Sequence, residues 1–403
     1  MAGPVTPPLP LEAAQARLLG AVEPLAEEAV AAEQAVGRYL AGPLLASRTQ
    51  PAHDLSAMDG YAMRGDDLDG PWTVIGESAA GHPFLGTLAP GQAIRISTGA
   101  MMPDGGGAVL LQENAARDGD TLSLNGEGPP RYRHIRRAGF DFRAGDALMA
   151  AGKRIGPAQL ALALAAGHGA LSVRRLPTLA ILDSGDELAA DPAICAPHQV
   201  PASNGAMLAA MCAPHSASVL RLGPVPDTME AMLAALGKAS DAEVIVTSGG
   251  ASVGDHDLVR PALEQWGAEI DFWRVAVKPG KPLLVARKGP QWILGLPGNP
   301  VSSYVTAFLF LLPLLRRLGG AAELLPRPLT LPLGMTLPPV GDRTEFLRAR
   351  VEDGALVAVH EQDSSALRAL SAAEMLIMRP AGAAEAGLGE PALAYRLENG
   401  GIA

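Results

Sequence analysis

A run of apolar residues that passes directly into a glycine-rich polar turn occurs three times in this chain. It is found at residues 179–188 (LAILDSGDEL), 244–257 (VIVTSGGASVGDHD) and 292–303 (WILGLPGNPVSS), and a cationic loop, VKPGKP, lies at residues 277–282. This pattern is typical of parallel strands in an α/β sheet, which present functional residues at their carboxyl ends. The four segments therefore predict one anionic-ligand site at one edge of a sheet.

The residue types in these turns suit an anion. Glycine allows backbone N–H groups to approach an oxyanion, while hydroxyls and lysines add donors and charge. The expected donors and cations are Thr247, Ser248, Ser252, Lys278 and Lys281. The carboxylates of Asp186, Glu187, Asp255 and Asp257 would repel a phosphate unless a divalent ion such as Mg²⁺ bridged them. The alternative is that SGG and PGNP are only tight turns, but four such segments in one αβ region disfavour it.

Composition sets limits on the class of protein. A chain of 403 residues exceeds one ordinary core and predicts about two to four domains. Mean hydropathy is +0.17, yet no uninterrupted apolar run reaches the roughly 20 residues of a membrane span. The longest candidate, residues 304–315, contains Pro313 and is followed by two arginines, so we expect a buried helix there and no membrane association. The opening MAGPVTPPLP lacks the features of a signal peptide, and with two cysteines this predicts a cytoplasmic protein.

Charge and cysteine usage exclude further classes. A net charge of −10 disfavours nucleic-acid binding, because such surfaces neutralise phosphates with Lys and Arg. The segment RYRHIRR at residues 131–137 is either a second basic pocket or a solvated strand face. Cys195 and Cys212 have no CxxC spacing, so we expect them to be core or surface thiols without a metal or redox role.

The order of patterns along the chain predicts several modules. Residues 9–40 have helical spacing and predict one or two helices, whereas residues 43–137 contain short β-like runs between turns and predict an inserted all-β domain. Pro and Gly bracket a helix at residues 157–169. From residue 178 to about 319, alternating patterns predict a three-layer α/β domain with a mostly parallel sheet, and the last segment reads as β.

Six motifs give the chain a resemblance to a known family. In order, they are SAMDGYAMR, RISTGAMMPDGGGAVLLQE, SGDEL, TSGGASVGDHD, KPGKP and GLPGNPVSS, at residues 56–64, 95–113, 184–188, 247–257, 278–282 and 295–303. They occur in the order found in the MoeA family, the molybdopterin molybdenumtransferases, which are related to the eukaryotic gephyrin E domain. The resemblance extends from about residue 9 to the C-terminus.

The resemblance implies a fold. It is an elongated homodimer of four-domain subunits, with an α/β part similar to molybdopterin adenylyltransferase. The implied domains are an α/β molybdopterin-binding domain (1–21 and 176–322), a helical hinge and dimerisation domain (22–42 and 138–175), an inserted β domain (43–137) and a C-terminal β-barrel-like domain (323–403).

The resemblance also implies a function, which is insertion of molybdenum from molybdate into adenylylated molybdopterin with Mg²⁺. Molybdopterin adenylyltransferase and recipient apo-molybdoenzymes are the implied protein partners. Carried over by motif, the catalytic residues are Asp59, Asp141, Glu187, Asp227 and Asp257, of which Glu187 and Asp257 are the metal ligands. The substrate-binding residues are Thr98, Ser248, Gly249, Gly250, Ser252, Arg274, Lys278, Lys281, Pro297, Gly298, Asn299, Pro300 and Ser364. SAMDGYA of one subunit would face the α/β loops of the other.

The chain departs from the family pattern at four places. Phe140 replaces a frequent Glu, Arg274 replaces a frequent Lys, Gly107 replaces an acid, and Asp363 stands in QDSS where QGSG is usual. Without the resemblance, Asp59 reads as an ordinary turn aspartate and Thr98 as a strand-end cap. Two other functions remain open, adenylyl transfer to molybdopterin and a non-catalytic, gephyrin-like scaffold. Consumption of ATP would indicate adenylyl transfer. The absence of both ATP consumption and AMP release would indicate a scaffold.

Overall fold

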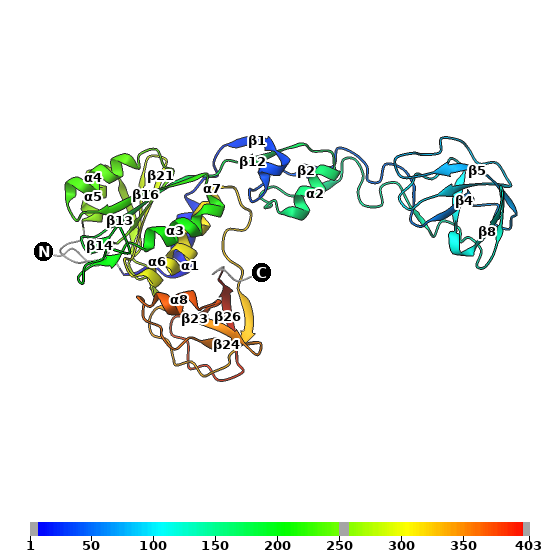
Figure 1. Ribbon diagram of the computed structural model, residues 1–403. Helices are drawn as coiled ribbons and strands as arrows, with labels where there is room; N and C mark the ends of the chain where they lie inside the picture. The colour runs from blue at the N-terminus through cyan, green and yellow to red at the C-terminus, as the bar shows by residue number, and fades with distance from the viewer. Residues whose placement is uncertain (1–6, 250–257, 398–403) are drawn as a thin grey trace.

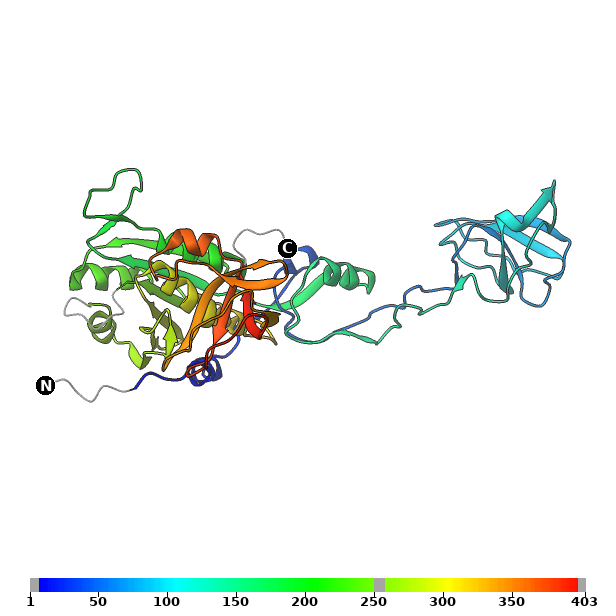
Figure 2. The same cartoon turned by 90° about the horizontal axis from the view of Figure 1, so that it is seen from below.

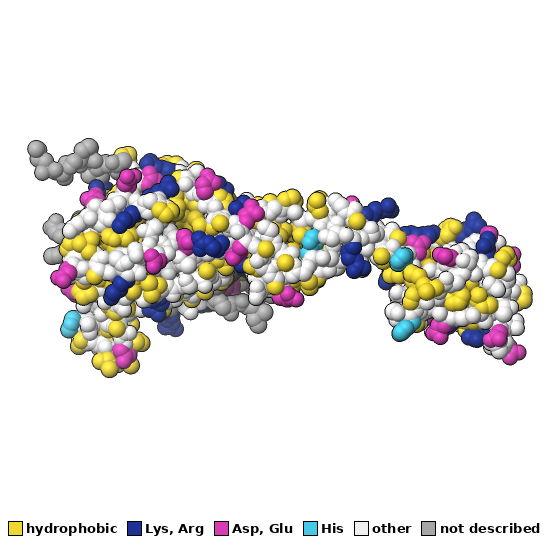
Figure 3. All heavy atoms as spheres, turned by 90° about the horizontal axis from the view of Figure 1, so that it is seen from above, with side chains coloured by type: hydrophobic (Ala, Val, Ile, Leu, Met, Phe, Trp, Pro, Cys, Tyr) yellow, Lys and Arg dark blue, Asp and Glu magenta, His cyan; other side chains and the backbone are white. Residues whose placement is uncertain are grey.

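The computed structural model describes residues 7–249 and 258–397. The molecule is elongated: an α/β part and a C-terminal β part form a body at one end, a small module lies in the middle, and a β domain lies at the far end (Figures 1 and 2). In the space-filling view, the molecule narrows between the middle module and this distal domain (Figure 3).

The α/β part is built on a six-stranded sheet. The strand order is β16 (Ser218–Val225), β13 (Thr178–Ser184), β17 (Val244–Ser248), β21 (Gln291–Leu296), β20 (Leu284–Lys288) and β18 (Glu269–Trp273). The first four strands are parallel, as expected, but β20 runs antiparallel to both of its neighbours. A two-residue turn, Gly289 and Pro290, joins β20 to β21, and such a short connection can only join antiparallel strands.

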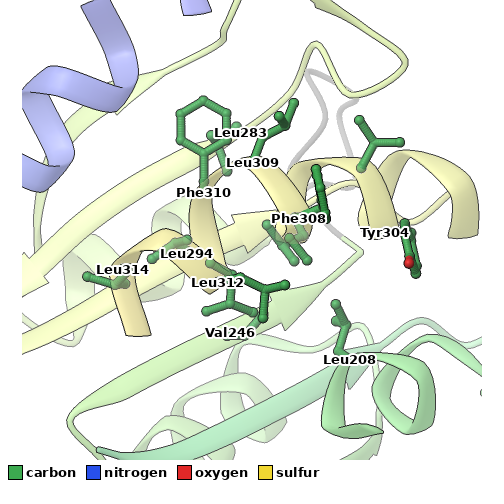
Figure 4. Packing of buried hydrophobic residues seen from close by; sticks show 14 of the residues in the cluster. Leu208, Val246, Leu283, Leu294, Tyr304, Phe308, Leu309, Phe310, Leu312 and Leu314 are labelled. Carbon is green, nitrogen blue, oxygen red and sulfur yellow. The ribbon is translucent and has the colours of Figure 1, made fainter. Parts of the chain in front are cut away.

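Helices cover both faces of this sheet, which confirms the three-layer prediction. On one face lie α1 (Leu11–Gly20), α3 (Asn204–Cys212) and the helix of residues 300–318, and on the other lie α4 (Met229–Lys238) and α5 (Val259–Gln265). Successive side chains of β17 enter opposite cores: Val244 and Val246 pack with the first set and Ile245 with the second. Figure 4 shows the first core, where Val246 and Leu294 of the sheet meet Leu312 and Leu208 of the helices.

The long apolar helix is a core helix. It comprises α6 (Pro300–Thr306), a π-helical segment (Ala307–Leu311) and α7 (Leu312–Leu318). Within the described residues it is the one helix long and apolar enough to cross a membrane, but 83% of its apolar window is buried inside the protein. Pro313 has no N–H for the carbonyl of Leu309, and the side-chain amide of the buried Gln15 donates to that carbonyl at 2.9 Å instead.

The middle module differs from expectation. After α1 ends at Gly20, the chain forms β1 (Glu27–Ala31), which pairs antiparallel with β12 (Ala170–Arg174), and a short 3-10 helix (Ala32–Ala35). The prediction of one or two helices in residues 9–40 is therefore confirmed for α1 but wrong for residues 27–31, where pairing with β12 decides the conformation. The module also contains β2 (Leu44–Leu45), β11 (Ala147–Met149) and α2 (Pro157–Ala165), and α2 agrees with its sequence signals.

The distal domain is β-rich, as the turn-punctuated sequence predicts. Its sheet has the order β7 (Gly106–Leu111), β4 (Gly60–Arg64), β6 (Gln92–Ile96), β5 (Trp72–Ser78), β9 (Thr121–Leu124) and β8 (Ala115–Asp118). A short 3-10 helix (Gln112–Asn114) follows β7, and β3 (Leu55–Ser56) pairs with β10 (Ile135–Arg136). Tyr61 and Ala62 enter different apolar clusters, so both faces of β4 are covered.

The C-terminal part is a β-sheet to which the α/β part contributes one strand. Its order is β19 (Val277–Lys278), β23 (Thr344–Glu352), β25 (Met375–Arg379), β26 (Pro391–Arg396) and β22 (Leu329–Pro332), and β24 (Ala355–Ala358) also pairs with β23. Helix α8 (Leu367–Ser371) lies in the same part. Because β19 belongs to the VKPGKP loop, this sheet brings C-terminal residues to the predicted site.

Candidate functional site

The SGDEL loop follows β13 and carries two acids, Asp186 and Glu187. Gly185 has φ +148°, a conformation that a residue with a side chain rarely adopts, so glycine is needed at this position. The backbone N–H of Asp186 donates to the carboxylate of Asp227 at 3.3 Å, and the N–H of Asp227 donates to that of Asp186 at 3.1 Å. The predicted acids Glu187 and Asp227 therefore follow the neighbouring strands β13 and β16, whose loops are joined through Asp186.

The TSGG and PGNP loops meet the SGDEL loop. The N–H of Gly249 donates to the carbonyl of Leu296 at 3.2 Å, and a Cβ atom on Gly298 would lie 3.5 Å from the Cα of Gly249. A Cβ atom on Gly249 itself, where φ is +97°, would lie 2.7 Å from the carbonyl oxygen of Ser184. Backbone from all three strand ends thus converges on Gly249, as the pattern predicts.

Three hydroxyls beside these loops are buried and lack partners among the described residues. They belong to Thr247, Ser248 and Ser303. A buried hydroxyl without a hydrogen bond is costly, so such groups commonly serve a bound ligand or water. Ser248 was predicted to bind substrate, whereas Ser303 was not singled out.

The VKPGKP loop forms one wall of a cavity of about 370 Å³. Lys278 pairs in register with Glu345 of β23, and the Lys278 ammonium forms an ion pair with the Glu345 carboxylate at 2.9 Å. Lys281 and Arg343 also line the cavity. Its other lining residues are Pro279, Gly280, Pro282, Ser302, Phe346, Leu347, Gln362, Asp363 and Ser364.

Ser364 joins the cavity to the PGNP loop. The side-chain amide of Asn299 donates to the Ser364 hydroxyl at 3.0 Å, and the N–H of Val301 donates to the Ser364 carbonyl at 3.0 Å. Pro300 occupies the first turn of α6, where its missing N–H has no cost. Pro297, Gly298, Asn299 and Pro300 therefore connect the three strand-end loops with the cavity, and Ser364 lies beside them.

Arg274 has an unusual backbone. Its φ of +107° is sparsely populated for a residue with a side chain, and two hydrogen bonds hold it there. Its N–H donates to Leu283 and its carbonyl accepts from Leu9. Where the family often has lysine, this chain thus carries a guanidinium on a fixed backbone at the start of the segment that leads to Lys278.

The distal domain carries the other predicted acids. The Asp59 carboxylate accepts from the backbone N–H of Thr98 at 2.6 Å and from its hydroxyl at 2.9 Å. These bonds, the backbone one first, lower the pKa of Asp59, so the group is a carboxylate at neutral pH. Asp141 lies on the segments that lead to this domain, where its N–H donates to Gln50, beside the 74% exposed Phe140.

One subunit does not bring all predicted residues together. The distal domain, with Asp59 and Thr98, lies at the opposite end of the molecule from the loops of the α/β sheet (Figure 1). The basic segment of residues 131–137 belongs to the distal end as well, where Arg137 pairs with Asp54 and stacks on Tyr132. It therefore adds nothing to the cavity within one chain.

Several predictions fall outside the described residues. They concern Gly250, Ser252, Asp255 and Asp257. In residues 7–249 and 258–397, no group of three or more His, Cys, Asp or Glu side chains is placed to hold a metal ion. Mg²⁺ commonly takes only one or two carboxylates, together with substrate phosphates and water, and the hard oxygens of Glu187 and its neighbours fit that requirement.

Sequence reasoning missed Arg343, Glu345 and Ser302 as lining residues. Ser302 follows the PGNP turn and offered a signal, because it lies in a quoted motif. Arg343 and Glu345 offered none, since only the pairing of β19 with β23 brings them to the lysine loop. Both cysteines are free thiols, one half-buried and one in the core, and burial raises the pKa of Cys212 to about 12.

Comparisons with known proteins agree along the whole chain. Three family models match, described as the MoeA N-terminal region (domain I and II) at residues 9–167, a probable molybdopterin binding domain at residues 180–317, and the MoeA C-terminal region (domain IV) at residues 330–397. The chain is 34% identical to a molybdopterin molybdenumtransferase of Haemophilus influenzae, over 78% of this chain and 79% of that protein.

Two further relatives cover nearly all of the chain. A molybdopterin molybdenumtransferase of Bacillus subtilis is 31% identical over 98% of this chain and 95% of its own length. A crystal structure of a molybdopterin biosynthesis MoeA protein from Pyrococcus horikoshii superposes with a TM-score of 0.80 at 27% identity, covering 97% of this chain and 99% of that one.

Proposed function

This chain belongs to the MoeA family of molybdopterin molybdenumtransferases, and we propose that it inserts molybdenum from molybdate into adenylylated molybdopterin. The observation that carries the proposal is the cavity beside the PGNP loop. Three cationic side chains, those of Lys278, Lys281 and Arg343, and the Ser364 hydroxyl line it. Molybdate is a tetraoxo dianion, and such a set of cations and hydroxyl donors is what it requires.

The size and location of the cavity support a site in which molybdate and the pterin nucleotide bind next to each other. Its volume of about 370 Å³ exceeds that of one oxyanion and lies in the range of small-molecule sites. Asn299 and Ser364 connect it with the glycine loops, whose N–H groups and hydroxyls, unpartnered among the described residues, suit a pyrophosphate. The pterin nucleotide would lie across these loops, with its dithiolene sulfurs directed toward the oxyanion.

The acids of the SGDEL loop have a separate role in this proposal. Glu187, with Asp257, would hold Mg²⁺, and the ion would offset the charge of the pyrophosphate as AMP is released. Asp227 fixes the loop through its paired bonds with Asp186. Lys278, Lys281 and Arg274 then offset the remaining negative charge of pterin, phosphates and oxyanion.

We further propose that the active form is a homodimer. Asp59 and Thr98 lie far from the cavity of their own chain, so only a second subunit would bring a distal domain to it. Helix α2 supports this arrangement: it reads PAQLALALA, only Ala163 is fully buried, and Leu164 is 44% exposed. An apolar helix with so little cover is suited to a subunit interface.

The proposal has consequences for partners and location. Adenylylated substrate would come from a molybdopterin adenylyltransferase, and apo-molybdoenzymes would accept the product. The two cysteines are free thiols, which suits the reducing cytoplasm.

The decisive experiment is a defined reaction with adenylylated molybdopterin, Mg²⁺ and molybdate. We expect molybdate-dependent release of AMP and a product that activates a cofactor-free molybdoenzyme. Lys278→Ala should weaken the affinity for substrate and reduce its dependence on salt, whereas the exposed Lys238→Ala should not. ATP consumption without molybdate would identify an adenylyltransferase instead, and the absence of both reactions would leave a scaffold.

A further inference from the structure

Arg348 is a buried arginine that forms no ion pair with a carboxylate of the described residues, although the charges of Glu361 and Asp363 act on it from farther away. It lies on β23, and its side chain is 1% exposed. Its two terminal nitrogens donate to the backbone carbonyls of Glu361 and Asp363, each at 3.0 Å, while Nε has no partner in the described part of the chain. Because burial of a guanidinium is costly, the burial of Arg348 beside residues 361–365 needs an explanation.

The loop above Arg348 is held by side chains rather than by a strand or helix. The amide oxygen of Gln362 accepts from the N–H of Arg348 at 3.1 Å, and its amide nitrogen donates to the Arg348 carbonyl at 2.9 Å. The carboxylate of Asp363 accepts from the N–H of Ser365 at 2.8 Å and from its hydroxyl at 2.6 Å. The conformation of residues 361–365 is thus held by bonds to Arg348 of β23 and by the bonds of the Asp363 carboxylate inside the loop.

Ser364 is the residue that this arrangement presents. Arg348 donates to the carbonyl of Asp363, and this carbonyl belongs to the peptide group that links Asp363 to Ser364. On its other side, Ser364 bonds Asn299 and Val301 at the start of α6. The loop is therefore clamped between a buried guanidinium and the N-terminus of a core helix, and it forms one wall of the cavity.

We propose that Arg348 is a positioning residue that acts through Ser364 to set the affinity of the cavity for its oxyanion. The planar guanidinium bonds two carbonyls at once, which the single ammonium of lysine cannot do with the same geometry. Arg348 also lies under the cavity wall as a fixed positive charge. The proposal rests on the proposed function in one respect, that the cavity binds molybdate.

The experiment compares Arg348→Met and Arg348→Lys with Arg350→Met. Arg350 is a matched control, since it lies on the same strand, is exposed and bonds the carbonyl of Ala372 instead. The first measurement is amide hydrogen exchange and needs no activity. We expect faster exchange in residues 361–366 and at the N–H of Val301 in Arg348→Met, a smaller change in Arg348→Lys, and none in Arg350→Met. Unchanged exchange at these amides would overturn the positioning role.

The second measurement is kinetic. We expect Arg348→Met to raise the molybdate concentration for half-maximal AMP release at least tenfold, with the affinity for the pterin nucleotide within about twofold of wild type. Ser364→Ala should have a similar effect. The Arg348→Met, Ser364→Ala double variant should respond to molybdate no more weakly than the more affected single variant, because both changes remove the same contact with the oxyanion. Additive effects, or an unchanged molybdate response, would overturn the proposal.

A third variant covers the case in which Arg348→Met does not fold. Gln362→Ala removes the two bonds between the Gln362 side chain and the Arg348 backbone of β23 without uncovering a buried charge. It should show the same exchange pattern and the same shift in molybdate response, and wild-type values for both would overturn the proposal. A wild-type protein without molybdate-dependent AMP release would refute the proposed function, while hydrogen exchange would still decide whether Arg348 positions Ser364.

Discussion

Lys278 and Glu345 occupy paired positions on the neighbouring parallel strands β19 and β23, and their side chains form a 2.9 Å ion pair at the wall of the cavity. An incoming oxyanion must compete with the Glu345 carboxylate for the Lys278 ammonium. The Lys278 side chain is 56% exposed, so the pair is weak and can be opened by a ligand.

Removal of the competing carboxylate should therefore strengthen oxyanion binding. Glu345→Gln keeps the side-chain shape but frees the lysine, and we expect about two- to fivefold higher affinity for molybdate at low salt, an advantage that salt reduces. Calorimetric titration measures it, with Glu352→Gln as the control, because Glu352 is exposed at the other end of the same strand. Weaker binding by Glu345→Gln would mean that the carboxylate itself helps to hold the ligand.

Asp186 of the SGDEL loop and Asp227, which follows β16, are joined by two backbone-to-carboxylate bonds, so charge can be removed there without loss of geometry. Asp227→Asn retains an oxygen that can accept from the N–H of Asp186. We expect AMP release to fall at least tenfold, equivalent to about 1.4 kcal/mol of transition-state stabilisation, and the Mg²⁺ requirement to rise. Asp191→Asn changes an exposed acid outside these two loops and serves as the control. Normal turnover by Asp227→Asn at limiting Mg²⁺ would remove Asp227 from the site.

His215 should make the protein acid-sensitive. Burial, followed by the charges of Arg316 and Arg154, lowers the pKa of His215 to about 4. The unfolded chain therefore binds a proton below about pH 6.5 that the folded chain does not, so stability falls as pH is lowered from 6.5 toward 4. Between pH 7 and pH 5 we expect this group to cost roughly 1–2 kcal/mol.

The test is thermal unfolding of wild type and His215→Gln across this pH range. The variant should lose less stability on acidification, while the exposed His198→Gln should follow wild type. Parallel curves for His215→Gln and wild type would show that the imidazole takes up its proton in the folded state.

The parts of the fold that sequence predicted are those whose signal is local. The strand before TSGG, β17, is a short apolar run with β-branched residues that ends at glycine, and its partners in the sheet have the same pattern. The convergence of three strand ends on Gly249 follows from their parallel order. Ser364 and Asn299 were named as site residues by the family resemblance and not by a local signal, and only the structure shows that their side chains are in contact.

The features that sequence did not predict depend on partners far along the chain. Strand β1 has the composition of a helix, and β12 determines its conformation. In the π-helical segment, the carbonyl of Leu309 accepts from Gln15 of another helix. The contact of Glu345 with Lys278 arises because a strand of the α/β part joins the C-terminal sheet. None of these contacts has a local signature.

The proposed composite site predicts complementation between inactive subunits. Asp59→Ala should remove the contribution of the distal domain, and Lys278→Ala that of the cavity, so each homodimer should be inactive at low substrate. In a mixed dimer, one site would combine the intact distal domain of one subunit with the intact cavity of the other, while the second site would carry both lesions. If subunits exchange at random, half the dimers are mixed and each has one good site of two, so about a quarter of wild-type activity should return.

Two measurements make this result decisive. Subunits with different affinity tags report exchange directly, and a mixture of Asp59→Ala with Asp141→Ala serves as the control, because both acids lie on the same side of the proposed interface. That mixture should stay inactive, since every mixed dimer retains a damaged distal segment at both sites. Recovery of AMP release in the first mixture alone would place the Asp59 carboxylate, which Thr98 holds ionised, opposite the cavity of the neighbouring subunit. No recovery despite verified exchange would assign Asp59 and Lys278 to the same subunit's site, which the extended chain can form only by bending between the middle module and the distal domain.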